Sequence, residues 1–95
     1  MNADSARTIC YQLAPGVAIR PERFGGLVYR YDNRRLYFLH SHQAVEFVKQ
    51  LDGRRTLQAQ LDDFLADRQM PQSAGESLVK AVAQLEKLGI LTQAQ

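Results

Sequence analysis

The stretch that decides the fold is residues 27–39, which read LVYRYDNRRLYFL. Both of its arms are rich in residues that favour strands, and the first arm places Leu27, Tyr29 and Tyr31 on one face. Residues 32–34 form the turn between the arms, because Asp and Asn tolerate left-handed backbone and bond their own turn amides. The stretch therefore predicts an antiparallel hairpin.

The chain before this hairpin adds a third strand. Residues 17–20 (VAIR) predict a short strand that ends at Pro21, whose missing N–H suits a strand end or an edge. Residues 24–26 (FGG) are a turn or bulge signal. We expect an antiparallel meander whose strands are 17–20, 27–31 and 36–39.

Beyond the meander the apolar residues recur at helical spacing and predict three helices. Ser41 caps the first, which residues 52–53 stop, and Thr56 caps the second. Ser73 with Glu76 forms a capping box that opens the third. The apolar positions of the three helices are Ala44, Phe47, Val48 and Leu51, then Leu57, Leu61, Phe64 and Leu65, then Leu78, Val82, Leu85 and Leu88.

The two ends of the chain complete one small domain. Gly89 ends the third helix, after which residues 90–91 fold back as a hydrophobic contact or a short closing strand. Small polar residues at the start predict a flexible tail over 1–10, followed by one folded domain over 11–92. The expected class is α+β, with a three-stranded antiparallel sheet followed by three helices, as in a winged helix-turn-helix.

Composition excludes several classes of protein. The chain has 95 residues, of which 45% are hydrophobic and 23% charged, as in an ordinary globular domain. No apolar run approaches the roughly 18 residues of a membrane span, and the start lacks a signal peptide, so a cytoplasmic protein is expected. The single cysteine, Cys10, excludes an internal disulfide and a zinc or iron–sulfur site built from this chain's cysteines. The net charge of +2 is too weak to indicate a nucleic-acid binder by itself.

The polar residues do not assemble a catalytic set. His40 and His42 flank Ser41, but no acidic or thiol ligand or orienting acid lies close in sequence, so solvent-exposed or cap-side histidines are favoured. The carboxylates of residues 62–67 read as a solvated helix face. The pair at 25–26 lacks the Lys-Ser/Thr of a phosphate loop. We therefore expect neither an enzyme nor a cofactor.

The arm at residues 36–39 (LYFL) is apolar on both of its faces. A sheet with one wet face should alternate instead, so either the helices and the tail cover both faces or the strand pairs with another chain. In the second case an extended peptide adds as a further strand, and a proline at Tyr37 is expected to remove an edge donor. A second copy of the protein is an alternative occupant, which would make a homodimer.

A winged-helix regulator that reads DNA is the competing interpretation. Lys80 and Lys87 in the third helix are offset by Glu76 and Glu86, and the second helix is acidic. A helix docked in the major groove normally carries Lys or Arg to phosphates and bases, so the charges argue against DNA.

Residues 20–29 (RPERFGGLVY), followed by 36–39, resemble the mycofactocin-system peptide chaperones. That family belongs to the precursor-peptide recognition elements, a group that includes the pyrroloquinoline quinone peptide chaperone. Residues 51–56 and 85–91 are similar to the wider group, and the likeness extends from about residue 11 to 91.

The resemblance implies a winged-helix-like, non-catalytic module that binds the leader of a ribosomally made precursor peptide and presents it to a radical S-adenosylmethionine maturase. It implies no partnership with nucleic acid or membrane. The leader would lie along the third strand, in a groove shared with the third helix, and its acidic character would suit steering by basic residues. The strand-side residues carried over are Arg35, Leu36, Tyr37, Phe38 and Leu39, with Arg34 beside them as a steering charge. The helix-side residues, chosen because they neighbour the core stripe without belonging to it, are Val79, Lys80, Ala83, Gln84 and Lys87.

Overall fold

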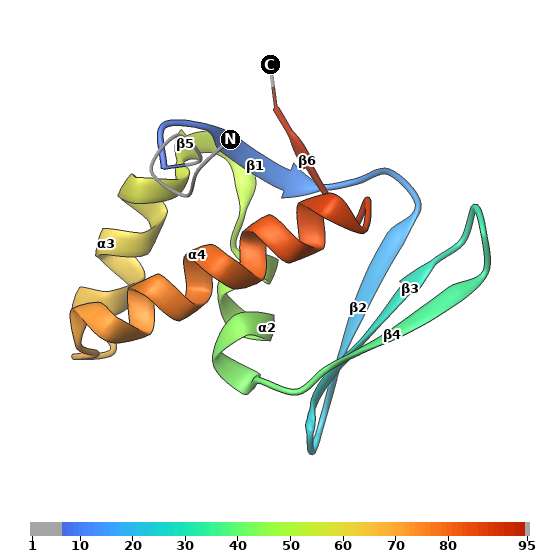
Figure 1. Ribbon diagram of the computed structural model, residues 1–95, viewed down its shortest axis with the longest axis horizontal. Coiled ribbons are helices and arrows are strands. Elements are labelled where there is room, and N and C mark those ends of the chain that lie inside the picture. The colour runs from blue at the N-terminus through green and yellow to red at the C-terminus, as the bar shows by residue number, and fades with distance from the viewer. Residues whose placement is uncertain (1–6, 95) are drawn as a thin grey trace.

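In the computed structural model, which describes residues 7–94, the predicted hairpin forms β3 (Gly25–Arg30) and β4 (Arg35–Leu39) (Figure 1). The third strand, β2 (Val17–Glu22), pairs with the other side of β3, so the order is β2-β3-β4 and all pairs are antiparallel. Pro21 lies inside β2 opposite Gly26 and does not end the strand as predicted. It is tolerated because β2 is an edge strand, where a missing N–H costs no ladder bond if it faces away from the neighbour.

The three expected helices are α2 (His42–Lys49), α3 (Leu57–Asp67) and α4 (Gln72–Lys87). The first two caps are confirmed, because the Ser41 hydroxyl accepts from the Ala44 N–H and Thr56 from Ala59. The capping box of Ser73 and Glu76 is wrong. Helix α4 starts one residue after Pro71, which has no side-chain cap, so Ser73 already lies in the first turn.

A second small sheet is the main departure from the predicted fold. It consists of β1 (Cys10–Leu13), β5 (Asp52–Thr56) and β6 (Leu91–Gln93) in the order β5-β1-β6, with antiparallel pairs. The expected turn after the first helix is therefore a strand, whereas the closing strand after Gly89 is confirmed. The α+β class holds, but with two three-stranded sheets and three helices.

The second sheet also includes part of the segment expected to be a tail. Cys10 begins β1, and the carbonyl of Ile9 accepts a hydrogen bond from the N–H of Leu57 at 2.8 Å. Residues 7–10 thus contact the folded chain, whereas the rest of the predicted tail, residues 1–6, lies outside the described residues.

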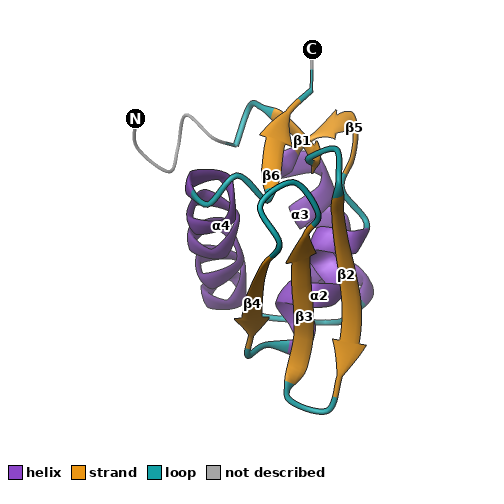
Figure 2. Ribbon diagram, turned by 90° about the vertical axis from the view of Figure 1, so that its right-hand side faces the viewer, coloured by secondary structure: helices purple, strands orange, loops and turns teal. Residues whose placement is uncertain are grey.

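The core lies between the helices and the inner faces of the two sheets. Val28 of β3 is fully buried, and the rings of Phe47 and Phe64 meet edge to face at 5.1 Å between α2 and α3. The apolar positions predicted for the first two helices are all buried, and of those on α4 only Leu88 is partly exposed. Figure 2 shows the sheet β2-β3-β4 in front of α2 and α3, with β4 as the edge strand on the side of α4.

Two glycines allow the hairpin to approach its neighbours closely. A Cβ on Gly25 would collide with the carbonyl oxygen of Leu39 in β4, and one on Gly26 would come within 2.7 Å of Val45 Cγ2 in α2. Gly25 also has φ +142°, a conformation essentially restricted to glycine. The pair is thus needed where β3 meets both β4 and α2.

We predict that Gly25→Ala destabilises the protein by about 3 kcal/mol or more, because backbone must move to relieve the clash. Gly16→Ala is the matched control, since Gly16 has φ +78° but open space around it, and it should cost only about 1 kcal/mol of backbone strain. Urea unfolding measures both values. Equal losses for the two variants would contradict the close approach of β3 and β4.

Tyr11 couples the second sheet to α4 and gives a pH-dependent prediction. Its buried hydroxyl donates to Glu86 Oε1 at 3.1 Å, and burial, followed by this hydrogen bond, raises the pKa of Tyr11 to about 12. The unfolded chain loses this proton near pH 10 and the folded protein does not, so the free energy of unfolding should fall between pH 10 and pH 12. Tyr11→Phe should lose less stability over this interval in urea titrations. An identical fall in both proteins would refute the coupling.

Candidate functional site

Within residues 7–94, β4 has a hydrogen-bonded neighbour on one side only. Which of its backbone groups are open follows from the ladder. The N–H of Tyr31 donates to the carbonyl of Gly16 at 2.8 Å, in register with the β2–β3 pairs. Since hydrogen-bonded and non-hydrogen-bonded pairs alternate, odd-numbered residues of β3 bond to β2 and even-numbered residues bond to β4.

The register then shows which residues of β4 form backbone hydrogen bonds with β3. Tyr37, opposite Val28, directs its N–H and C=O toward β3, as do the two ends of the strand. Leu36 and Phe38 direct theirs toward the open edge. The expectation that a proline at Tyr37 removes an edge donor is therefore wrong, because that proline would break the protein's own ladder with Val28.

The side chains of β4 divide in the same alternation. Tyr37 and Leu39 are half-buried and pack against the core, whereas 54% of Leu36 and 63% of Phe38 is exposed. The helices thus cover one face of this strand and not both. The apolar character of its second face is left without a covering element in the described part of the chain.

A cavity of about 350 Å³ lies where the end of β4 meets α4. Leu39 and Ala44 line it from the side of β4 and α2, and four residues of α4 line it from the other side. Those four are Ala74, Ser77, Leu78 and Ala81. Its volume is at the lower end of the range for pockets that hold small ligands, about 300–1,000 Å³. Small side chains on the helix leave room for apolar side chains of another chain beside the open strand.

At the other end of α4, the helix is bonded to the sheet by Arg30. Its Nη1 donates to the carbonyl of Leu88 at 2.8 Å, and its Nε and Nη2 donate to the carboxylate of Asp32 at 3.1 and 2.6 Å. This bond to Asp32 holds the pKa of Arg30 above and that of Asp32 below their ordinary values. A guanidinium at the C-terminal carbonyls of a helix is also favoured by the helix dipole. Arg30 therefore ties the sheet to the end of α4.

The predicted helix-side residues do not form this cavity. Val79 is only 1% exposed and belongs to the core, contrary to the expectation that it merely neighbours the core stripe. The other four predicted residues are exposed, but they lie one helical row away from the residues of α4 that line the cavity. They are Lys80, Ala83, Gln84 and Lys87. Gln84 alone continues the row of Ser77 and Ala81, at spacings of seven and three. The small residues at positions 74, 77 and 81 could have indicated the cavity wall from the sequence, and our sequence analysis missed them.

Arg35 is the first residue of β4 and Arg34 lies in the turn before it, and both are exposed. Neither takes part in an ion pair within the described part of the chain. The turn therefore places two uncompensated guanidinium groups beside the open strand.

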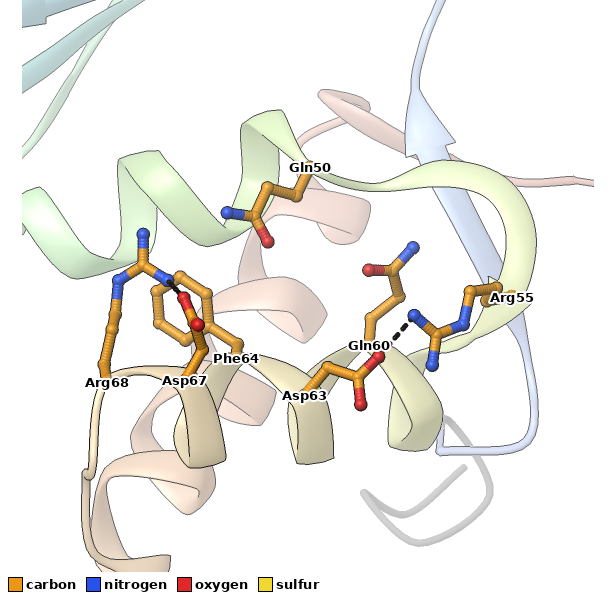
Figure 3. Close-up of a pocket in the computed structure, with 7 residues that line it drawn as sticks. All are labelled: Gln50, Arg55, Gln60, Asp63, Phe64, Asp67 and Arg68. Carbon is orange, nitrogen blue, oxygen red and sulfur yellow. Dashed lines mark ion pairs between the residues drawn. The ribbon is translucent and has the colours of Figure 1, made fainter.

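A polar pocket on α3 concerns the competing DNA interpretation (Figure 3). Arg55 pairs there with Asp63 at 2.6 Å, and Arg68 pairs with Asp67 at 3.5 Å while stacking on the ring of Phe64. These guanidinium groups are already neutralised by carboxylates. The pocket thus adds no basic face to the helices that would have to read DNA.

The two histidines have separate neighbours. His42 Nε2 lies 2.6 Å from the carbonyl of Arg23, and His40 packs against the rings of Phe24 and Phe38 at 5.3 and 6.4 Å. Over residues 7–94, no group of three His, Cys, Asp or Glu side chains is placed to hold a metal ion. Nor does this part of the chain contain a helix both long and apolar enough to cross a bilayer.

Within residues 7–94, an open strand edge lies beside a mostly apolar cavity and two arginines that make no ion pair, an arrangement that suits the class of peptide-binding modules. Comparison with known families agrees with this class. Residues 10–92 match the peptide chaperone MftB family, and the chain belongs to that family. Searches of curated proteins and of solved structures find no match. Family membership supports the earlier resemblance and indicates a peptide partner and a chaperone role.

The tie between sheet and helix can be tested directly. Arg30→Met should speed amide hydrogen exchange at Gly89–Leu91 and in β4, because the bond to the Leu88 carbonyl is lost. Arg20→Met is the control, since the exposed Arg20 pairs only with its near neighbour Glu22 at 2.8 Å. Exchange at residues 89–91 and in β4 that is equally fast in both variants would contradict the role given to Arg30.

Proposed function

We propose that the protein is a peptide chaperone of mycofactocin biosynthesis that takes the leader of a precursor peptide as a fourth strand on β4 and presents it to a radical S-adenosylmethionine maturase. The observation that carries the proposal is the open edge of β4, where Leu36 and Phe38 direct unpaired backbone groups outward beside the cavity on α4. Membership of the peptide chaperone MftB family supports the peptide as occupant.

Backbone pairing alone would give weak binding. Leu36 and Phe38 offer two donors and two acceptors, and four hydrogen bonds at about 1 kcal/mol each correspond to a millimolar Kd. Useful affinity must therefore come from apolar side chains of the leader. The cavity between Leu39 and α4 can receive those on the inner side, and exposed Phe38 can pair with those on the outer side.

Charge at the start of β4 favours an acidic leader. Arg34 and Arg35 have no carboxylate partner in the described residues and would attract acidic side chains before docking. Lys80 and Lys87 are exposed on α4 but lie off the cavity row, so their contribution should be smaller. The chemistry belongs to the maturase in this proposal, and the present chain positions its substrate.

The strand-addition mechanism predicts that Phe38→Pro weakens leader binding far more than Phe38→Ala. Both variants lose the ring, but only proline removes the outward N–H, and Pro21 in β2 shows that this sheet accepts proline in an edge strand. Fluorescence anisotropy with a labelled synthetic leader of a mycofactocin precursor peptide measures the difference. We expect about a tenfold further loss, with circular dichroism unchanged.

Equal affinities of the Ala and Pro variants would exclude pairing on this edge. Tight binding of the wild-type protein to random duplex DNA at physiological salt would instead support a winged-helix regulator.

The charge argument gives a separate prediction. Arg34→Glu combined with Arg35→Glu should slow association with the acidic leader, and the effect should shrink as salt is raised. Lys80→Glu combined with Lys87→Glu makes the same change of charge on α4 and serves as the matched control. Stopped-flow measurements at two salt concentrations compare the pairs. A larger effect of the lysine pair would move the site toward α4.

A further inference from the structure

The outer face of the sheet β2-β3-β4 carries an apolar surface that the peptide site leaves unexplained. In the register, Leu27 lies opposite Phe38 and Tyr29 opposite Leu36, so these side chains share the face directed away from the helices. Tyr31 extends the row at 62% exposure. We call these five residues the outer patch. Figure 2 views this side of the molecule, and no helix lies over the sheet there.

The outer patch is hollowed as well as exposed. A depression of about 470 Å³ lies over β2, β3 and the start of β4, with Ala18, Leu27, Tyr29 and Leu36 among its walls. Phe24 lies beside Phe38 with ring centroids 5.7 Å apart and continues the apolar surface toward the β2–β3 turn. Large exposed apolar surfaces of this kind mark interaction sites in folded proteins.

A peptide on the edge of β4 cannot cover this surface. Neighbouring strands lie about 4.8 Å apart, so an added strand would be about 10 Å from β3. Its side chains reach Leu36 and Phe38, which are on the adjacent strand. Half-buried Leu27 and Tyr29 and exposed Tyr31 gain no cover from the bound peptide.

The charges around the outer patch indicate what kind of surface fits it. Arg23 and Arg34 are exposed and make no ion pair in the described chain, whereas Arg35 shares the alternation of Tyr37 and Leu39 toward the helices. The nearby carboxylates Glu22 and Asp32 are each neutralised by an arginine two residues away. The rim is therefore positive, and a complementary surface has an apolar centre bordered by carboxylates. A second copy stacked on the same face would bring the positive rims together.

We propose that the outer patch docks the maturase that modifies the peptide, through an apolar centre and an acidic border on that enzyme. This inference rests on the proposed function and adds the surface that performs the presentation. Strand β4 then serves both partners, because its edge holds the leader while Leu36 and Phe38 on its outer side contact the enzyme. The leader is thereby held one strand away from the enzyme surface.

The test separates the two sites by measuring two affinities for each variant. Tyr31→Glu, alone and with Leu27→Glu, should weaken binding to the purified maturase by about tenfold or more, as expected for a buried aromatic anchor. Both variants should bind the synthetic leader as the wild type does. Ala66→Glu adds the same charge at an exposed position of α3 and should change neither affinity.

Unchanged maturase binding by both variants, with leader binding intact, overturns the docking surface and leaves the peptide site standing. Failure of the wild-type protein to bind the leader overturns the proposed function instead.

Tyrosine nitration of the wild-type protein gives a readout that needs no variant. Tyr31 is the most exposed of the described protein's large apolar side chains after Phe38, and it should be nitrated in the free protein. The maturase should protect Tyr31, and the leader alone should not. Protection by the leader, or none by the maturase, contradicts the assignment. A wild-type dimer in sedimentation that Tyr31→Glu converts to monomer would assign the face to a second copy.

Discussion

The pairing register between β3 and β4 is the constraint on which the rest of the site depends. Because Val28 faces Tyr37, the backbone groups of Leu36 and Phe38 point outward and those of Tyr37 point inward. A shift by one residue would exchange both the open groups and the buried side chains. This register brings β3 close to its neighbours at Gly25 and Gly26, where a single added carbon would strike β4 or α2. A side chain at either glycine would therefore disturb the packing around β3, and with it the pairing that leaves the edge of β4 open.

The position of α4 turns this edge into one wall of a site. Arg30 bonds the helix end at Leu88, and small side chains at Ala74, Ser77 and Ala81 leave space on the row that faces β4. An open edge strand without a neighbouring wall would offer only weak, unselective backbone bonds. The cavity supplies the apolar contact from which selectivity between peptides can arise. Family membership and geometry thus agree on a peptide as the partner.

The exposed large apolar side chains of the described chain gather on the sheet β2-β3-β4 and the turns beside it. Two arginines beside α3 are paired with carboxylates, in Arg55–Asp63 and Arg68–Glu46, whereas Arg34 and Arg35 make no ion pair within the described residues. This distribution separates an edge that suits an extended peptide from a face that suits a folded protein. The two proposals both use β4, and together they would account for the apolar side chains on both faces of that strand.

Much of the fold could be predicted from local sequence pattern, because the spacing of apolar residues along a strand or a helix indicates which of its faces is buried. The hairpin, the Ser41 and Thr56 caps and most of the core could be predicted in this way. The second sheet could not, since its strands are short and residues 52–56 (DGRRT) contain few strand-forming residues. It exists because segments far apart in sequence meet and satisfy one another's backbone groups.

The candidate site, too, could be predicted from the sequence only in part. Composition and order placed an apolar strand at the edge of the sheet with arginines before it, because those properties belong to the segment itself. Only the tertiary structure decided that Val79 is buried while Ala81 faces the strand, because the rotation of α4 depends on everything packed against it. It also decided which amides of β4 are free, since that depends on the ladder with β3 and not on any residue's own preference.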